Sequence, residues 1–424
     1  MPSGIYAETS AAPRESAGVA RSLTPFTRLD ATMSTSAALP AQYLSPGALR
    51  RRETGRHGCT APYLMYSNAG ERWLPCLQLL RVSRIPTGEP GDHVMGDTTR
   101  RQALAAATIG AAAVALTGPA GAQPAVGGKP RGGKQDPRSK YPKPPFKGQS
   151  QPWPGLASQM DPKPDHGETS YVGSGRLSGR KALITGGDSG MGRAAAIAYA
   201  REGADVAINY LPEEEPDARE VVDLIRKAGR KAVAIPGDLR TAAFCQELVA
   251  KAVAGLGGLD IVVCNAGRQQ SVPSILDLTD DEFDRTMKTN IYAPFWIIRA
   301  AVPHLEPGSV IIGTASEQAY DPSPDLYAYA QTKAATMNYV KSLAKQLGSK
   351  GIRVNGVAPG PIWTPLQISG GAQPGKVVTF GSTAPLGRPG QPAELAGIYV
   401  RLAEDDGSYT TGNIYGAGGG QGQP

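Results

Sequence analysis

One short stretch constrains the fold of this chain more than any other. An apolar segment, Lys181–Ile184, runs into a glycine-rich turn, Thr185–Gly192, and then into a helix-forming segment, Arg193–Arg201. Glycines let the backbone turn sharply and approach a ligand closely, and the first amides of a helix attract an anion such as a pyrophosphate. This order therefore predicts the opening unit of a dinucleotide-binding sheet.

From Gly179 to the C-terminus, strand and helix patterns alternate. Further strands are predicted at Asp205–Tyr210, Lys231–Ile235, Leu259–Val263, Ser309–Thr314 and Arg353–Val357, with helical segments such as Asp280–Asn290 between them. Such alternation is typical of a parallel sheet covered by helices on both faces. We expect an α/β fold with a Rossmann-type, doubly wound parallel sheet, in a single domain that spans residues 177–424.

The composition changes ahead of this domain. Residues 1–94 contain no lysine and show neither helical nor strand periodicity, so we expect a disordered extension or a stretch that is not translated. Residues 123–176 are rich in proline, glycine and lysine, which predicts a linker and an extended arm. Its apolar residues Phe146, Trp153 and Leu156 could pack on the folded body or on a neighbouring subunit.

Residues 95–122 have the order of an export signal. The pair Arg100-Arg101 precedes an apolar run, Ala103–Leu116, and a small-x-small sequence, Ala120-Gly121-Ala122. This resembles a twin-arginine signal, although alanine stands at the start of the run where phenylalanine is usual. The run is too short for a stable membrane span, which needs about 20 apolar residues. If translation starts at Met95, we expect a periplasmic protein, and otherwise a cytoplasmic one.

Charge and cysteine content exclude other classes. The formal net charge is +7, but the basic residues are scattered and form no basic helix interleaved with aromatics, so no nucleic-acid partner is expected. Of the four cysteines, Cys245 and Cys264 lie in the predicted domain, and the sequence has no CxxC and no histidine pair at metal spacing. We expect buried free thiols and no metal site.

A tyrosine and a lysine supply candidate chemistry. Tyr329 and Lys333 are four residues apart on a predicted helix, so their side chains share a face. A neighbouring ammonium favours the phenolate, so we expect Lys333 to lower the pKa of Tyr329 from its ordinary value of about 10. The phenol could then exchange a proton with an alcohol or a carbonyl group. Tyr320 and Tyr327 have no cation four residues further on.

Together these features resemble the short-chain dehydrogenase/reductase family. The resemblance covers about residues 177–419, and it rests on the glycine turn, on Asn265-Ala266-Gly267 after the fourth strand, and on the ordered set Asn290, Ser316, Tyr329 and Lys333. The segments Met160–Glu168 and Asn209–Pro212 resemble the glucose/ribitol dehydrogenase-like branch, whose members carry an N-terminal arm. His166 is then expected to pack within that arm.

The resemblance implies a role for each of these residues. Tyr329 is the acid/base, Lys333 lowers its pKa and binds the nicotinamide ribose, Ser316 orients the substrate oxygen, and Asn290 holds a water in a proton relay. Thr364 holds the nicotinamide carboxamide. Cofactor contacts are also expected from Gly186, Asp188, Ser189, Gly190, Met191, Gly192, Asn209, Tyr210, Asp238, Leu239, Asn265, Ala266, Gly267, Tyr329, Lys333, Pro359, Gly360 and Ile362.

The choice of cofactor depends on the end of the second strand. An acidic residue there favours NAD and a nearby arginine favours NADP, and Asn209, Tyr210 and Leu211 are neither. Glu213–Glu215 would repel a phosphate, so we expect NAD, with NADP as the alternative. Asp238, after the third strand, is either an acceptor for the adenine amino group or an ordinary helix N-cap.

The predicted function is hydride transfer between NAD(P) and an alcohol, polyol or sugar hydroxyl, or the matching carbonyl. The substrate is expected near Gln269, Gln270, Glu317, Gln318 and Trp363. One alternative is a non-catalytic NAD(P)-binding sensor or regulator, which does not need the complete tyrosine, lysine and serine set. Another is a sugar-nucleotide epimerase, which needs a larger C-terminal domain than this chain has.

The resemblance also implies a homotetramer. Two departures, Cys264 in place of an asparagine and the missing aspartate at Gly416–Gly419, concern the scaffold and the terminal strand.

Overall fold

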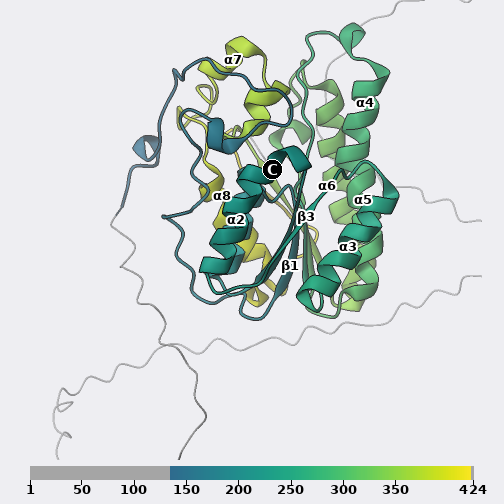
Figure 1. The fold of residues 1–424 in the computed structure, drawn as a ribbon. Coiled ribbons are helices and arrows are strands. Elements are labelled where there is room, and N and C mark those ends of the chain that lie inside the picture. Colours follow the sequence, from purple (N-terminus) through teal and green to yellow (C-terminus); the bar gives the residue numbers. More distant parts are fainter. Residues whose placement is uncertain (1–133, 422–424) are drawn as a thin grey trace, which may run out of the picture. The chain divides into compact units, whose positions relative to one another are not determined.

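The computed structural model describes residues 134–421 (Figure 1). The expected extension (residues 1–94) and export signal (95–122) lie outside the described residues, so both stay predictions. Among the described residues, no helix combines the length and the apolar character that a membrane crossing requires. The same part of the chain has no cluster of three or more histidine, cysteine or acidic side chains that could hold a metal ion.

Seven parallel strands form one sheet in the order β3-β2-β1-β4-β5-β6-β7. The chain builds the sheet outward from β1 to β3 and then returns to start β4 on the other side of β1. Ligands of such sheets bind at the carboxyl ends of the strands, at this reversal point. The expected doubly wound parallel sheet is confirmed, with strands β1 Lys181–Thr185, β2 Asp205–Tyr210, β3 Ala232–Pro236, β4 Ile261–Cys264, β5 Val310–Thr314, β6 Arg353–Pro359 and β7 Ile414–Ala417.

The central strands are apolar throughout because both of their faces are buried. Successive side chains of a strand point to opposite faces. In β1, Ala182 and Ile184 pack into one hydrophobic layer and Leu183 into the other, and all three are fully buried. A parallel sheet covered on both faces therefore produces continuous apolar runs in the sequence.

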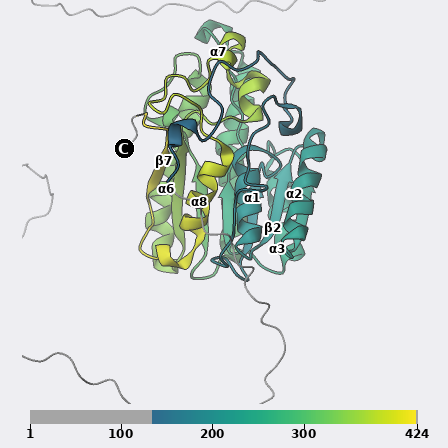
Figure 2. The ribbon, with the colours of Figure 1, turned by 90° about the vertical axis from the view of Figure 1, so that its left-hand side faces the viewer.

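Helices form a layer on each face of the sheet (Figures 1 and 2). One layer belongs to the first hydrophobic core and the other to the second. The first contains α1 Gly190–Arg201, α2 Glu215–Lys227 and α8 Pro392–Ala403, and the second contains α3 Ala242–Leu256, α5 Ala293–Ala301 and α6 Tyr327–Leu347. Two shorter helices, α4 Asp280–Met287 and α7 Pro374–Val378, precede α5 and follow β6 respectively.

Two predicted helices differ from the observed ones at their ends. The helix after the glycine turn begins at Gly190 and not at Arg193, with Ser189 in an extended conformation as its N-cap. Glycine disfavours helix, so the sequence pattern places this first turn in the loop. The helix predicted at Asp280–Asn290 is α-helical only to Met287, and a π-helical segment, Lys288–Tyr292, follows it. Such wider turns are rare and occur frequently at functional sites.

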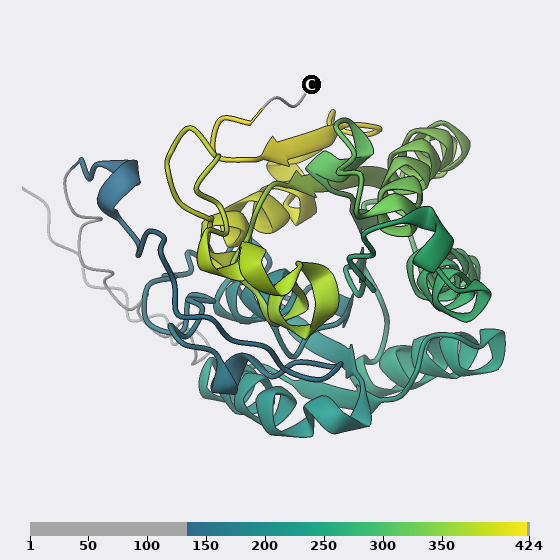
Figure 3. The same cartoon turned by 90° about the horizontal axis from the view of Figure 1, so that it is seen from above.

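The arm, residues 134–176, lies along the folded body. Seen from above, it passes between the segment around α7 and the elements of the β2 side (Figure 3). Phe146 stacks on Trp363 with ring centroids 4.4 Å apart, and both belong to a small separate core beside α7. His166 is buried, and its Nδ1 lies 2.9 Å from Glu168 Oε1, which is a packing role.

Candidate active site

A groove crosses the carboxyl ends of the strands at the reversal point between β1 and β4. The glycine turn, the ends of β2, β3 and β4, and the start of α6 line it. Of the residues expected to bind the cofactor, the groove brings together Gly186, Asp188, Ser189, Gly190, Met191, Asn209, Tyr210, Asp238, Leu239, Asn265, Ala266, Gly267, Tyr329, Lys333 and Thr364. Residues from six separate parts of the sequence therefore meet in one place.

Four expected cofactor residues do not line the groove. Gly192 lies behind the turn, where an added Cβ would come within 2.8 Å of the carbonyl carbon of Gly186, so it shapes the turn from behind. Pro359, Gly360 and Ile362 line an adjoining pocket instead. Pro359 ends β6 and the other two follow it, on the side of the second pocket described below.

The end of β4 holds the glycine turn in place. Asn265 Nδ2 donates hydrogen bonds to the carbonyl oxygens of Thr185 and Gly186, at 3.2 and 3.1 Å. The backbone amide of Asn265 also donates a hydrogen bond, to Thr185 Oγ1 at 3.0 Å. Gly186 has φ +61, a conformation that favours glycine. These bonds join the first and fourth strands where a dinucleotide would bridge them.

At the end of β3, the structure excludes one of the two interpretations of Asp238. The N-cap of α3 is Thr241, whose Oγ1 accepts a hydrogen bond from the amide of Phe244 at 3.3 Å, so the N-cap interpretation of Asp238 is wrong. Asp238 lines the groove and pairs with Arg240 at 2.6 Å. Asn209 uses its amide nitrogen to bond the carbonyl oxygens of Ile235 and Gly237, which joins β2 to β3.

A second pocket adjoins the groove. Ser316, Glu317, Gln318 and Gln269 line it. Tyr329 lines both spaces, together with Met191, Thr364 and Leu366. Tyr329 therefore stands where the groove and the pocket meet, whereas Tyr320 and Tyr327 line neither.

Two residues expected near the substrate lie elsewhere. Trp363 is fully buried, and its Nε1 donates to the carbonyl oxygen of Pro162 at 2.8 Å. Its large apolar ring is used to pack the arm and cannot contact a substrate. The side chain of Gln270 faces Gly370 and lines separate hollows. The expected contacts of Trp363 and Gln270 are therefore wrong.

The electrostatics of Tyr329 and Lys333 differ from the expectation. Burial raises the pKa of Tyr329 to about 12, and the hydrogen bond with Ser316 offsets this only in part. Burial lowers the pKa of Lys333 to about 8. The Lys333 ammonium lies 5.3 Å from the centroid of the Tyr329 ring and donates to the carbonyl oxygen of Thr314 at 2.7 Å. The expected lowering of the Tyr329 pKa is not seen in this arrangement, because burial and the nearby Glu317 carboxyl outweigh the Ser316 hydrogen bond.

The side chain of Asn290 is committed to protein partners. Its Oδ1 accepts from the amide of Arg268 at 2.7 Å, and its Nδ2 donates to the Arg268 carbonyl at 2.9 Å and to Thr332 Oγ1 at 3.0 Å. Asn290 lies in the π-helical segment and joins the loop after β4 to α6, which carries Tyr329 and Lys333. The amide thus fixes the position of the two candidate catalytic residues relative to the groove.

The cysteines of the domain are buried and free, as predicted. Burial raises the pKa of both Cys245 and Cys264 to about 12. Thiols with such high pKa values are poor nucleophiles. They belong to the scaffold.

Sequence reasoning missed several residues of the groove. Most of them adjoin predicted residues at strand ends, so a wider window around each strand end would have included them. The three from the arm carry no local sequence feature that points to a ligand. The missed residues are Trp153, Pro154, Gly155, Gly237, Arg240, Arg268, Arg285, Thr289, Thr314, Ala315, Pro365, Leu366 and Ser369. Leu211, Glu213 and Glu214, which the sequence places at the cofactor end of the second strand, line the groove as well.

Comparison with known proteins agrees with this geometry. A protein-family model described as enoyl-(acyl carrier protein) reductase matches residues 186–421, more than half of the chain. The uncharacterized oxidoreductase YghA of Escherichia coli (strain K12) is 55% identical over 287 residues, which are 68% of this chain and 98% of that protein. The glucose and ribitol dehydrogenase of Daucus carota is 42% identical over 282 residues, 65% of this chain and 96% of that protein.

A solved structure has the same fold. It is a short-chain dehydrogenase from Burkholderia cenocepacia J2315 in complex with NADP, 35% identical with a TM-score of 0.54, and the match covers 58% of this chain and 98% of that one. The dinucleotide groove, the ordered tyrosine and lysine, and these matches lead to one conclusion. The chain belongs to the short-chain dehydrogenase/reductase family and is an NAD(P)-dependent oxidoreductase.

Proposed function

We propose that the chain transfers a hydride between NAD and a polyol, a sugar or a related alcohol, or the matching carbonyl, with Tyr329 as the acid/base. The position of Tyr329 at the junction of the groove and the pocket carries this proposal. Lys333 stands on the groove side and Ser316 on the pocket side. A proton donor between a dinucleotide site and a polar pocket suits the exchange of a hydroxyl proton.

Each residue has a distinct part in the proposed reaction. A nicotinamide bound in the groove supplies the hydride chemistry. Tyr329 takes the hydroxyl proton during oxidation and returns it during reduction, while Ser316 orients the substrate oxygen. Lys333, held by the Thr314 carbonyl, keeps a cation beside the phenol. Asn290 is a positioning residue, because its bonds hold the loop after β4 against α6.

The preference for NAD rests on the charges at the adenosine end. Glu213 and Glu214 line the groove there, close to Asp188. Burial, together with repulsion among neighbouring carboxylates, raises the pKa of both Asp188 and Glu214. A ribose phosphate placed beside them would add a further negative charge to this acidic cluster.

The arginines of the groove do not offset this effect. Arg240 lies 2.6 Å from Asp238, Arg285 lies 2.7 Å from Asp281, and Arg268 lies 2.5 Å from Glu282, so each is already paired with a carboxylate. The Burkholderia protein is in complex with NADP, so the fold itself accepts the phosphorylated cofactor. The preference therefore depends on the side chains at the end of β2.

The preference for a polar substrate rests on the lining of the pocket. The amides of Gln269 and Gln318 and the carboxyl of Glu317 line it. Gln269 Nε2 already donates to the Gly371 carbonyl and Gln318 Oε1 already accepts from the Ser323 amide. The other amide atoms of these two side chains and the Glu317 carboxyl are the groups that a ligand with several hydroxyls can pair. The name of the Daucus carota relative, glucose and ribitol dehydrogenase, describes substrates of this kind.

A substrate screen tests the proposal. Wild type is assayed with NAD and NADP against polyols, sugars and simple alcohols, and with NADH and NADPH against carbonyls. We expect turnover of a polyol or sugar, with NAD at least about tenfold more effective than NADP in kcat/KM, a difference of about 1.4 kcal/mol. Binding of a dinucleotide without any turnover would favour a non-catalytic sensor.

Tyr329→Phe then tests the assigned acid/base. We expect kcat to fall by at least about 100-fold, because general acid–base catalysis contributes about that much or more, while NADH affinity stays the same. Tyr327→Phe is the matched control, because Tyr327 lies on the same helix but is 49% exposed and lines neither space. Retained activity of Tyr329→Phe with an unchanged pH profile would refute the mechanism.

A further inference from the structure

Part of the arm crosses the mouth of the cofactor groove. We call residues 151–158 the strap. At one end, the amide of Gln151 donates to the carbonyl oxygen of Ile368 at 2.9 Å. At the other end, the amides of Ala157 and Ser158 donate to the carboxylate of Asp217, at 2.6 and 3.3 Å. Ile368 follows β6 and Asp217 belongs to α2, which follows β2, so the strap joins the two halves of the sheet across the groove.

The inner surface of the strap forms part of the groove wall. Trp153, Pro154 and Gly155 line the same space as the glycine turn, Tyr329 and Lys333. The centroid of the Trp153 ring lies 5.0 Å from the guanidinium carbon of Arg268. Arg268 Nε in turn donates a hydrogen bond to Glu282 Oε1 at 2.8 Å. A cation over an indole face stabilises that ring in one orientation. Trp153 is therefore held by the loop that follows β4.

The strap lies close against the segment after Thr364. A Cβ added at Gly155 would stand 3.1 Å from Ser369 Cβ and 3.2 Å from the carbonyl oxygen of Pro365. Ser369 and Pro365 themselves line the groove. Backbone contact at Gly155 therefore leaves little space between the strap and this wall.

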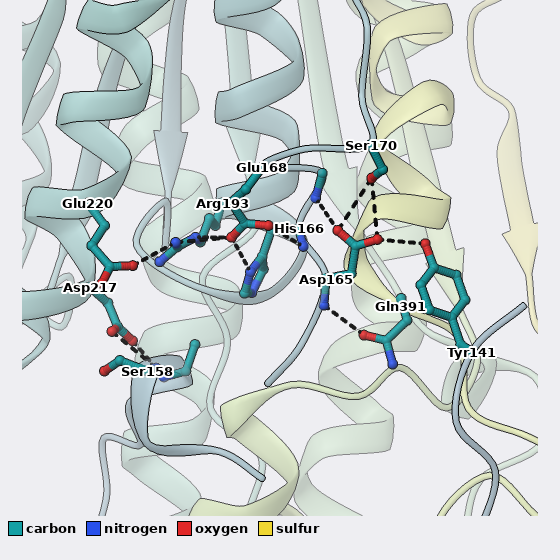
Figure 4. Close-up of polar contacts among 12 residues, drawn as sticks. Tyr141, Ser158, Asp165, His166, Glu168, Ser170, Arg193, Asp217, Glu220 and Gln391 are labelled. Carbon is teal, nitrogen blue, oxygen red and sulfur yellow. Dashed lines mark hydrogen bonds and ion pairs between the residues drawn. The ribbon is translucent and has the colours of Figure 1, made fainter. Parts of the chain in front are cut away.

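The rest of the arm keeps the strap in place (Figure 4). Arg193 on α1 joins Glu168 of the arm to Glu220 on α2, at 3.0 and 2.8 Å. On the other side, the amide of Asp165 donates to Gln391 Oε1 at 2.9 Å. The strap is thus a segment anchored on both sides of the groove.

The strap is an addition to the sheet domain that the solved relative shares. The Burkholderia structure is matched over 98% of its length but covers only 58% of this chain, about the length of residues 177–421. The match to the Escherichia coli oxidoreductase is longer, at 287 residues, and so extends beyond that domain. A relative whose length corresponds to the sheet domain therefore forms a complex with NADP, and the strap lies in the additional part of this chain.

We propose that Trp153, Pro154 and Gly155 belong to the dinucleotide site, and that the strap closes over bound NAD(P) and slows its release. The indole and the proline ring cover the ligand with apolar surface and exclude water from it. Release requires the strap to detach from Asp217 or from Ile368. Contacts of this kind act mainly on the dissociation rate. The inference rests on the groove being the cofactor site.

Dissociation kinetics test the proposal. The full chain is loaded with NADH or NADPH, whichever wild type binds more tightly, and chased with excess oxidised cofactor while nicotinamide fluorescence is followed by stopped flow. Trp153→Ala removes the covering ring, and Asp217→Asn weakens one anchor. We expect each to raise the dissociation rate at least about tenfold, which corresponds to the loss of about 1.4 kcal/mol of contact.

Two controls separate contact with the ligand from a general effect on the arm. Trp153→Phe keeps an aromatic ring over Arg268, so it should restore most of the slow release. Tyr141→Phe removes the bond from Tyr141 to Asp165, which is 2.7 Å long and lies in the arm outside the groove lining, so release should stay at the wild-type rate. Circular dichroism and thermal melts establish that each variant is folded.

The outcomes are distinct. Unchanged release in folded Trp153→Ala and Asp217→Asn overturns the proposal. If Asp217→Asn does not fold, Trp153→Ala decides alone, because Trp153 is only partly buried and its loss does not empty the main core. If wild type binds neither nucleotide, the proposed function fails together with the strap, whereas normal binding with unchanged release refutes the strap alone.

Discussion

Gly192, in the first turn of α1, is a position where a single methyl group should disturb the site from behind. A Cβ added there would lie 2.6 Å from Asn265 Nδ2 and 2.8 Å from the carbonyl carbon of Gly186, and closer still to the oxygen of that carbonyl. Real Cβ atoms essentially never approach other atoms within 3.0 Å, so the Gly186 peptide must move. We estimate a shift of roughly 1 Å, because a well-packed interior offers no free space.

The magnitude follows from two opposing effects of Gly192→Ala. Overpacking costs about 1–3 kcal/mol, and the helix preference of alanine over glycine returns about 1 kcal/mol. We therefore expect a net loss of about 0–2 kcal/mol in the free energy of unfolding. The displaced Gly186 lines the groove, and a misplacement of about 1 Å at a site can cost on the order of 100-fold in rate. We expect NADH affinity to fall at least about tenfold.

Gly397→Ala is the matched control. Gly397 is also helical, on α8, but it is exposed and an added Cβ there meets nothing within 4 Å. It should be neutral or stabilise the fold by up to about 1 kcal/mol. Urea unfolding followed by circular dichroism gives the stability, and fluorescence titration gives NADH affinity. If Gly192→Ala unfolds at the same urea concentration as Gly397→Ala and binds NADH like wild type, the close-approach argument is refuted.

Two acidic residues should show opposite pH behaviour. Burial alone would raise the pKa of Glu202, but hydrogen bonds from Arg176, Tyr171 and backbone amides outweigh it and hold the pKa at about 2. The stabilising contribution of the Glu202 carboxylate is complete above its ordinary pKa and is lost as pH falls toward about 2. Glu202→Gln should therefore melt at a lower temperature than wild type at pH 7 and lose less stability than wild type on acidification. An equal dependence of the melting temperature on pH in both proteins would contradict this. Burial followed by repulsion from Asp321 raises the pKa of Glu317 to about 7. The KM for a neutral polyol should therefore change more between pH 6 and 8 in wild type than in Glu317→Gln, where Lys333, with its pKa of about 8, still titrates. An identical pH profile in both would exclude Glu317 from substrate recognition.

Local order in the sequence determined most of the fold. A strand, a glycine turn and a helix follow one another within residues 181–201, and the strand bounds predicted from apolar runs lie within two residues of the observed ones. The prediction of the strands and helices succeeds because the spacing of apolar side chains and the backbone freedom of glycine depend only on neighbouring residues in the chain. The order of Asn290, Ser316, Tyr329 and Lys333 is likewise visible in the sequence alone.

Burial and long-range contact were decided by the tertiary structure. The sequence predicts a lowered pKa for Tyr329, whereas its enclosure raises it, because desolvation depends on every neighbour in space. The sequence places Trp363 near the substrate, whereas in the structure its side chain is fully buried and stacks on Phe146 of the arm. The strap depends on a bond between Ala157 and Asp217, which are sixty residues apart. Contacts between residues so far apart leave no periodic pattern in the sequence. The glycine turn of the groove can therefore be recognised from the sequence, but only the folded chain shows that the proline-rich arm lines the same groove.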